Sequence, residues 1–418
     1  MPAAKAHSWT FRSRFRASAF GWRSDLPIKR ITEAVAEIKK AAHKDKLLGA
    51  EGAVIFLEKV SGALEHVDSS SGAIGAAVNR AIEMVVPIIA QAPASDNLRD
   101  KWLERIWRAI EDDDIPYIEL LPDHWGELCV TPERASRWAD RFMQGVRLVW
   151  SPDLPRGGHF KGTAGCLSAL YAAGRHEDLL NLLDLASYKF WHDRQWGVRA
   201  LAAQGKTAAA IHYAEDTRGL NQPNSQISLA CEQILLSGGL WREAYDRYAL
   251  EANRHGTYLA TFQALTSKYP QIESKAILVD LVDRTPGEKG KWFAAAKSAG
   301  LFTEAAELAR ASPCDPKTLT RAARDFAASK PDFARSAGLS ALQWLLRGYG
   351  YDLSAQDVVD AFIHTLEAAQ HNGTEADTVR RIQLLVDQHP RAERTIIALL
   401  LRKIDEATKS SASRIGEL

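Results

Sequence analysis

The stretch LYAAGRHEDLLNLL (Leu170–Leu183) sets a pattern that the middle of this 418-residue chain repeats. The same order of small and apolar residues around a glycine returns in LAAQGKTAAAIHYA (Leu201–Ala214), LLSGGLWREAYDRY (Leu235–Tyr248) and AKSAGLFTEAAELA (Ala296–Ala309). Apolar residues at helical spacing on both sides of a glycine predict two antiparallel helices joined by a tight turn. Glycine ends the first helix because it adopts the left-handed conformation most easily.

The intervals between these glycines support a repeating architecture. They are 31, 34 and 61 residues, and the last is close to two of the others. Tyr269-Pro270 stands where the long interval predicts a missing unit, Lys330-Pro331 repeats that glycine-free variant, and Gly373 marks a weaker echo. Periods in the low thirties with two helices per unit are typical of tetratricopeptide-like arrays, whose hairpins bury their apolar faces by stacking. We therefore expect an all-α, right-handed solenoid of divergent tetratricopeptide-like hairpins.

The whole sequence divides into five predicted segments, and those outside the array are less regular. Residues 1–26 form a basic, aromatic N-terminal arm, and residues 27–150 have the periodicity of an irregular helical N-terminal domain. Residues 151–165 are rich in proline and glycine and are the expected boundary. The helical-repeat array then covers residues 166–408, and residues 409–418 are expected to be a frayed tail.

Composition limits the classes of function. The formal net charge of +1 argues against attraction of the whole surface to nucleic acid or membrane. The four cysteines are sparse, and no stretch approaches the roughly 20 apolar residues that span a bilayer. We expect a cytoplasmic protein without a membrane partner.

Four short stretches carry a resemblance that covers nearly the whole chain. They are VDSSSGAIG (Val67–Gly75), PIIA (Pro87–Ala90), WGELC (Trp125–Cys129) and KWFAAAK (Lys291–Lys297). They resemble a family of bacterial helical-repeat, tetratricopeptide-like proteins to which no activity is assigned. The resemblance implies a helical-repeat fold and a bacterial origin, and it brings no catalytic or binding residues.

Two patterns imitate cofactor sites. Gly205-Lys206-Thr207 ends like a phosphate-binding loop, but Ala200 stands where that motif needs a glycine, and the segment joins two predicted helices. A second set of residues would suit zinc but lacks a common ligand spacing; it comprises His159, His176, His192 and Cys166. Cys166 and Cys231 both lie eight residues before a repeat glycine, which predicts equivalent core positions. We therefore expect no cofactor and no metal.

The arm is the one segment with a plausible chemistry for nucleic acid. Its candidate binding residues are Arg12, Arg14, Arg16, Trp22 and Arg23, because arginine pairs with phosphates and aromatic rings stack on bases. The favoured alternative is that the aromatic residues, Trp22 included, dock onto the first helices while the arginines lie on the surface.

We expect a non-enzymatic scaffold or adaptor that binds a protein or peptide on the concave face of the array. A nucleic-acid-binding protein that uses the arm is the first alternative. The second is an enzyme with a site in residues 113–165, where His124 and Glu127 lie close to Cys129 in sequence and His159 follows.

Overall fold

The structure, a computed structural model, describes residues 7–151 and 158–415, with side chains as far as Lys409. Helix makes up 71% of it, and the described residues contain no strand. This confirms the all-helical fold and the packing of helices on their neighbours in sequence. The chain divides into two compact units, Met1–Gly238 and Gly239–Leu418.

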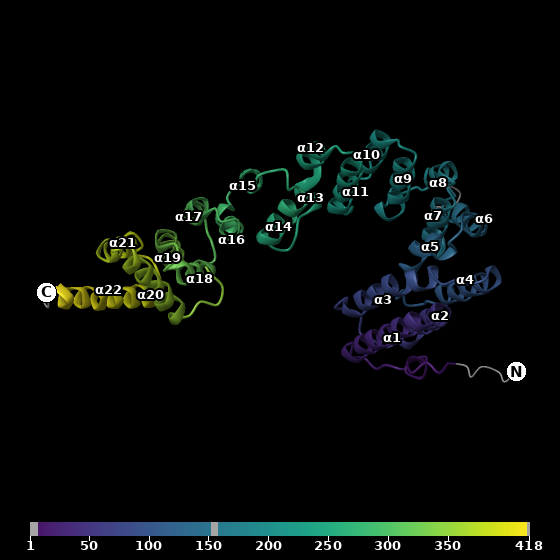
Figure 1. The fold of residues 1–418 in the computed structure, drawn as a ribbon, viewed down its shortest axis with the longest axis horizontal. Coiled ribbons are helices and arrows are strands. Elements are labelled where there is room, and N and C mark those ends of the chain that lie inside the picture. Colours follow the sequence, from purple (N-terminus) through teal and green to yellow (C-terminus); the bar gives the residue numbers. More distant parts are fainter. Residues whose placement is uncertain (1–6, 152–157, 416–418) are drawn as a thin grey trace. The chain divides into compact units, whose positions relative to one another are not determined.

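The first unit begins with the arm, which contains a short turn of helix at Phe11–Ser13. Its helices are α1 (Asp25–Lys44), α2 (Lys46–Ala63), α3 (Ala73–Ala90), α4 (Asp96–Glu111), α5 (Trp125–Cys129), α6 (Pro132–Val149), α7 (Thr163–Ala172), α8 (His176–Leu183), α9 (Trp191–Ala203), α10 (Thr207–Glu215) and α11 (Asn224–Ser237), with a 3-10 turn at Leu121–His124 before α5. Helices α1, α2 and α3 pack against one another and lie side by side in Figure 1.

Local signals place the helix starts in this unit. Asp45 accepts backbone hydrogen bonds from Leu47 (2.9 Å) and Leu48 (3.1 Å) at the start of α2. Ser95 accepts one from Leu98 at the start of α4 (3.4 Å). Such caps satisfy backbone N–H groups that have no partner inside the helix.

A single hydrophobic core extends from Trp9 to Ala200. Helices α6 and α7 pack directly against each other on either side of the expected boundary at residues 151–165. That segment therefore lies within the first unit, and the two compact units divide at Gly238 instead. Residues 152–157, which supplied most of the boundary signal, lie outside the described residues.

Helix α3 is, among the described helices, the one long and apolar enough to cross a membrane by length and composition. Its apolar side chains Ile74, Val78 and Val85 are fully buried, and the helix packs against α1 and α2. In this structure α3 is a core helix of the first unit.

The repeat glycines have the predicted left-handed conformation, with φ of 71° at Gly174, 73° at Gly205, 75° at Gly239 and 75° at Gly300. In three of these turns the N–H after the glycine donates to the carbonyl five residues earlier, always at 3.0 Å: Arg175 to Leu170, Lys206 to Leu201 and Leu301 to Ala296. This is the Schellman arrangement, which satisfies carbonyls at the helix end. Lys206 thus belongs to a hairpin turn between α9 and α10.

Burial explains most of the repeated positions around each glycine. The residues four before and five after it are all buried, for example Leu170 and Leu179. The position two before it is not part of the core, since Ala203 and Ser237 are exposed. The small side chains there are therefore not explained by core packing.

The second unit continues the hairpins. Its helices are α12 (Trp241–Ala244), α13 (Leu250–Ala252), α14 (Tyr258–Lys268), α15 (Ser274–Asp283), α16 (Phe293–Ser298), α17 (Phe302–Ala311), α18 (Pro316–Phe326), α19 (Pro331–Leu346), α20 (Ala355–His371), α21 (Glu375–Gln388) and α22 (Arg394–Ile415). A π-helical turn, Tyr245–Ala249, connects α12 to α13 without a break. Helix α22 runs well past Lys409, where a frayed tail was expected.

The glycine-free variants also lie at hairpin turns. Helix α14 ends just before Tyr269, and α19 begins at Pro331. Gly373 (φ 68°) shows that the weaker echo is a left-handed turn as well. Gly287, which is not one of the repeat glycines, has a φ of 85° and so shares the same backbone requirement.

Alanine substitution at two glycines tests the turn. An added Cβ meets nothing within 4 Å at Gly300 or at Gly75, but only Gly300 has a positive φ. We expect Gly300→Ala to lower the free energy of unfolding by about 1 kcal/mol, the cost of a left-handed non-glycine residue. Gly75→Ala, inside α3, should be neutral or slightly stabilising. Urea unfolding followed by circular dichroism measures both, and equal losses would contradict the turn's role.

Candidate functional site

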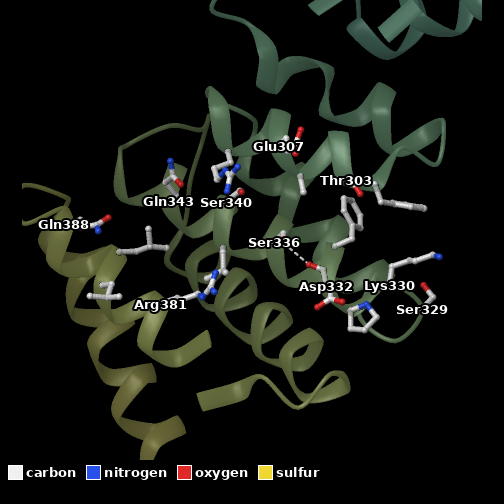
Figure 2. A pocket seen from close by; sticks show the side chains of 18 residues that line it. Thr303, Glu307, Ser329, Lys330, Asp332, Ser336, Ser340, Gln343, Arg381 and Gln388 are labelled. Atoms are coloured by element: carbon white, nitrogen blue, oxygen red, sulfur yellow. Dashed lines mark hydrogen bonds between the residues drawn. The ribbon is translucent and has the colours of Figure 1, made fainter. Parts of the chain in front are cut away.

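The candidate site is a groove in the second unit. Helices α17, α19 and α21 line it, and they are the second helices of three successive hairpins. Helix α19 packs against both α17 and α21. The cavity above α19 measures about 770 Å³, within the range of ligand-binding pockets (Figure 2).

Helix α19 forms the floor with side chains that recur every three or four residues. Ser336, Leu339, Ser340 and Gln343 all line the cavity and therefore share one face of the helix. The Ser336 hydroxyl donates to the carbonyl of Asp332 in the preceding turn at 2.8 Å (Figure 2). The serine side chains are small, so an incoming segment can approach the α19 backbone closely.

The walls add apolar surface. On α21, Leu384 is 57% exposed and lies beside Leu385 in the lining. On α17, the Phe302 ring packs on Phe333 of α19, with centroids 4.9 Å apart. A partly exposed leucine beside small floor residues offers an anchor point for a partner's apolar side chains.

The rim carries charges of both signs. Its members are Glu307, Arg310, Lys330, Asp332 and Arg381. Lys330 Nζ lies 5.7 Å from the centre of the Phe302 ring, and Arg381 Nε lies 2.9 Å from a carboxylate oxygen of Asp377. Sequence reasoning missed this groove, because its residues come from three helices and look like ordinary helix surface one at a time.

The arm docks onto the first helices through most of its aromatic residues. Trp9, Phe11, Phe15 and Phe20 are buried, and Phe11 and Phe15 make edge-to-face contacts with Phe56 of α2. A Cβ at Gly52 would collide with the Trp9 ring, so the glycine creates the space that this ring fills. The arm therefore belongs to the core of the first unit.

The polar groups of the arm are divided between the helix surface and solvent. Glu37 of α1 accepts the backbone N–H groups of Thr10 (2.8 Å) and Phe11 (3.2 Å), and Arg14 pairs with Glu33 (2.8 Å). The remaining candidate arginines, Arg12, Arg16 and Arg23, are exposed.

Trp22 corrects the docking prediction in one respect, because it is 71% exposed and does not cover a helix. Nucleic-acid binding by the arm stays a prediction that rests on this ring and the exposed arginines.

The residues proposed for a catalytic site converge only in part. His124 Nδ1 lies 3.4 Å from Glu127 Oε2. In the described structure no hydrogen bond or ion pair joins the exposed His159 to either of them. Cys129 is buried, and burial raises the pKa of its thiol to about 12. It is therefore protonated at neutral pH and unsuited to nucleophilic attack.

The structure adds residues that the sequence did not connect with this pair. His192 Nε2 of α9 lies 3.5 Å from Asp123 Oδ1, which is buried and accepts no hydrogen bond within the described structure. Burial raises the pKa of Asp123 and of Asp193, and the neighbouring carboxylate of Asp123 contributes to the shift of Asp193. No group of three or more possible metal ligands was found among the described residues.

The histidines and cysteine of the zinc pattern have separate surroundings. The His176 ring stacks on Tyr171 at 5.6 Å, and the Cys166 sulfur contacts the carbonyl of Ala139 in the core at 3.7 Å. Cys231 is buried like Cys166, as the repeat register predicted.

Comparison with known proteins found no family model that matches this sequence and no significant match among curated proteins.

Two tryptophan substitutions separate the docked part of the arm from its exposed part. Trp9→Ala should lower the free energy of unfolding by about 3 kcal/mol, because it empties the space above Gly52. Trp22→Ala should change it by no more than about 0.5 kcal/mol, since the ring is exposed. Urea unfolding of the two variants measures these changes. Similar losses of unfolding free energy would show that the Trp9 ring is not what holds the arm on the helices.

The partly buried carboxylate of Asp123 predicts a pH dependence of stability. The folded-state pKa of Asp123 is raised above the ordinary 3.8, so its contribution to stability is fully present below that value and is lost as pH rises through the folded-state pKa. Asp123→Asn should therefore raise the thermal midpoint at pH 7, and the gain should fade as the pH approaches 4.

Asp68 provides a control of opposite sign. A backbone hydrogen bond from Ser70 lowers its pKa, so Asp68→Asn should destabilise at pH 7 and have less effect in acid. Thermal melts of both variants across this pH range test the pair. A gain for Asp123→Asn that grew in acid would be inconsistent with a buried charged carboxylate.

Proposed function

We propose that this chain is a docking protein that holds a segment of another protein in the α17–α19–α21 groove. Three helices of successive hairpins present one face each to a cavity of about 770 Å³. Arrays of helical hairpins offer extended surfaces of this kind. We expected from the sequence that a protein or peptide partner binds the array, and the proposal assigns this binding to the residues that line the groove.

The observation that carries the proposal is the combination of a small-residue floor with an exposed apolar wall. Ser336 and Ser340 are small and leave room above the α19 backbone, and Leu384 is more than half exposed in the same lining. Burial of that leucine by a partner would gain hydrophobic free energy, at about 25 cal/mol per Å² of apolar surface. The Ser336 hydroxyl donates to the backbone carbonyl of Asp332, and the described lining contains no histidine that could act as its base, which favours binding over catalysis at this groove.

The exposed Trp22 favours a second candidate function. Its indole ring lies in a segment with the exposed Arg12, Arg16 and Arg23, which is the composition of a surface that stacks on bases and pairs with phosphates. Trp22→Ala is the variant in which binding of a single-stranded oligonucleotide would be lost without a loss of stability.

Panning a phage-displayed random peptide library on the full chain tests the docking function. We expect peptides that bind the natural chain and bind Leu384→Glu at least about tenfold more weakly, because the new charge would be buried against an apolar partner. Leu401→Glu is the matched control, since Leu401 is 42% exposed on α22 and does not line the groove. Enriched peptides that bind both variants alike would refute docking in this groove.

A further inference from the structure

We propose that the segment held in the α17–α19–α21 groove is an amphipathic helix whose apolar stripe is flanked by acidic side chains. This inference rests on the proposed docking function and names the chemistry of the partner. Its support comes from the width of the groove, the hydrogen-bonding capacity of its floor and the distribution of charge on its rim.

The spacing of the lining residues fits a helix that lies above α19. The floor extends from Asp332 to Gln343, which is about 16 Å or three helical turns. Packed helices lie about 8–10 Å apart, and α19 packs against both α17 and α21, so the axes of α17 and α21 are at most about 16–20 Å apart. That separation leaves up to about one helix diameter between their facing sides. A partner helix would place apolar residues at i, i+3 or i+4, and i+7 against the floor and walls.

The floor offers little to the backbone of an extended peptide. An extended segment leaves N–H and C=O groups that need partners when buried, whereas a helix satisfies its own. The Ser336 hydroxyl already donates to the carbonyl of Asp332, and Leu339, Leu384 and Leu385 are apolar. Ser340, Gln343 and Gln388 are the polar side chains left near them for a row of backbone groups. A helix therefore loses fewer hydrogen bonds than an extended strand on entering this groove.

The basic side chains of the rim are only partly neutralised by ion pairs with acidic groups. Asp377 is shared by three arginines, with N–O distances of 2.9 Å to Arg381, 3.3 Å to Arg335 and 3.8 Å to Arg380. On the opposite wall, Arg310 makes no ion pair within the described residues.

The two acids of the rim have other neighbours. Asp332 accepts a hydrogen bond from the Asn372 amide at 2.7 Å. Glu307 lies one helical turn before Arg310 on α17, so this acid and this base line the same wall. The charged residues of the rim are thus the bases Arg310, Lys330 and Arg381 and the acids Glu307 and Asp332, and this net positive charge complements acidic residues on the flanks of a partner helix.

Fluorescence anisotropy with two labelled synthetic helices tests the inference on the full chain. Both peptides carry the same leucine stripe; one has glutamate on its flanks and the other has lysine. We expect the glutamate peptide to bind at least about tenfold more tightly than the lysine peptide, with an affinity that falls as salt rises. Arg310→Glu should weaken the glutamate peptide about three- to tenfold and reduce its salt dependence.

Arg321→Glu, on α18 and outside the lining, is the matched control and should leave binding within about twofold. Tighter binding of the lysine peptide, lost in Leu384→Glu, would overturn the acidic partner and leave groove docking intact. Binding of the glutamate peptide that ignores both Leu384→Glu and Arg310→Glu would place it elsewhere and overturn the inference. Failure of the glutamate peptide to bind would overturn it too, while the library result decides separately on docking.

Discussion

The left-handed glycine at the end of the first helix of a hairpin is the constraint on which the repeating part of the structure depends. It lets the chain reverse within a few residues while the last carbonyls of the helix still find donors, as Arg175 does for Leu170. With the turn fixed, the positions before and after it are buried in the same core, for example Leu170 and Leu179. The faces left over by successive turns then line grooves such as the one above α19.

A stack of hairpins has ends whose apolar faces need cover, and the arm provides it for α1 and α2. The arm achieves this with aromatic rings instead of another helix, and Gly52 supplies the space in which Trp9 lies. Glu37 accepts hydrogen bonds from two backbone N–H groups of the arm, which would otherwise have no partner within the protein at the edge of the core. Basic residues placed between the buried rings are thereby left on the surface, as the exposed Arg12 and Arg16 show.

The features that could be predicted from the sequence are those decided by near neighbours in the chain. Helix caps, hairpin turns and the burial of Cys166 and Cys231 follow from periodicity and from the residues within one or two turns. Trp9 and Trp22 looked equivalent, because nothing local records that only one of them meets a glycine on another helix. The groove was not predictable for the same reason: its lining comes from three helices that are neighbours only after the hairpins have stacked.

The closure of the Gly174, Gly205 and Gly300 turns by hydrogen bonds within six residues also bears on how such a chain changes in evolution. The residues that end one helix and begin the next lie within a short stretch of sequence. Duplication of about one repeat length therefore adds a complete hairpin with its own turn. Gly174 and Gly205, 31 residues apart and nearly identical in φ, have the relation that such a copy would leave. A change of length in a segment between hairpins would alter their spacing and leave these turns unchanged.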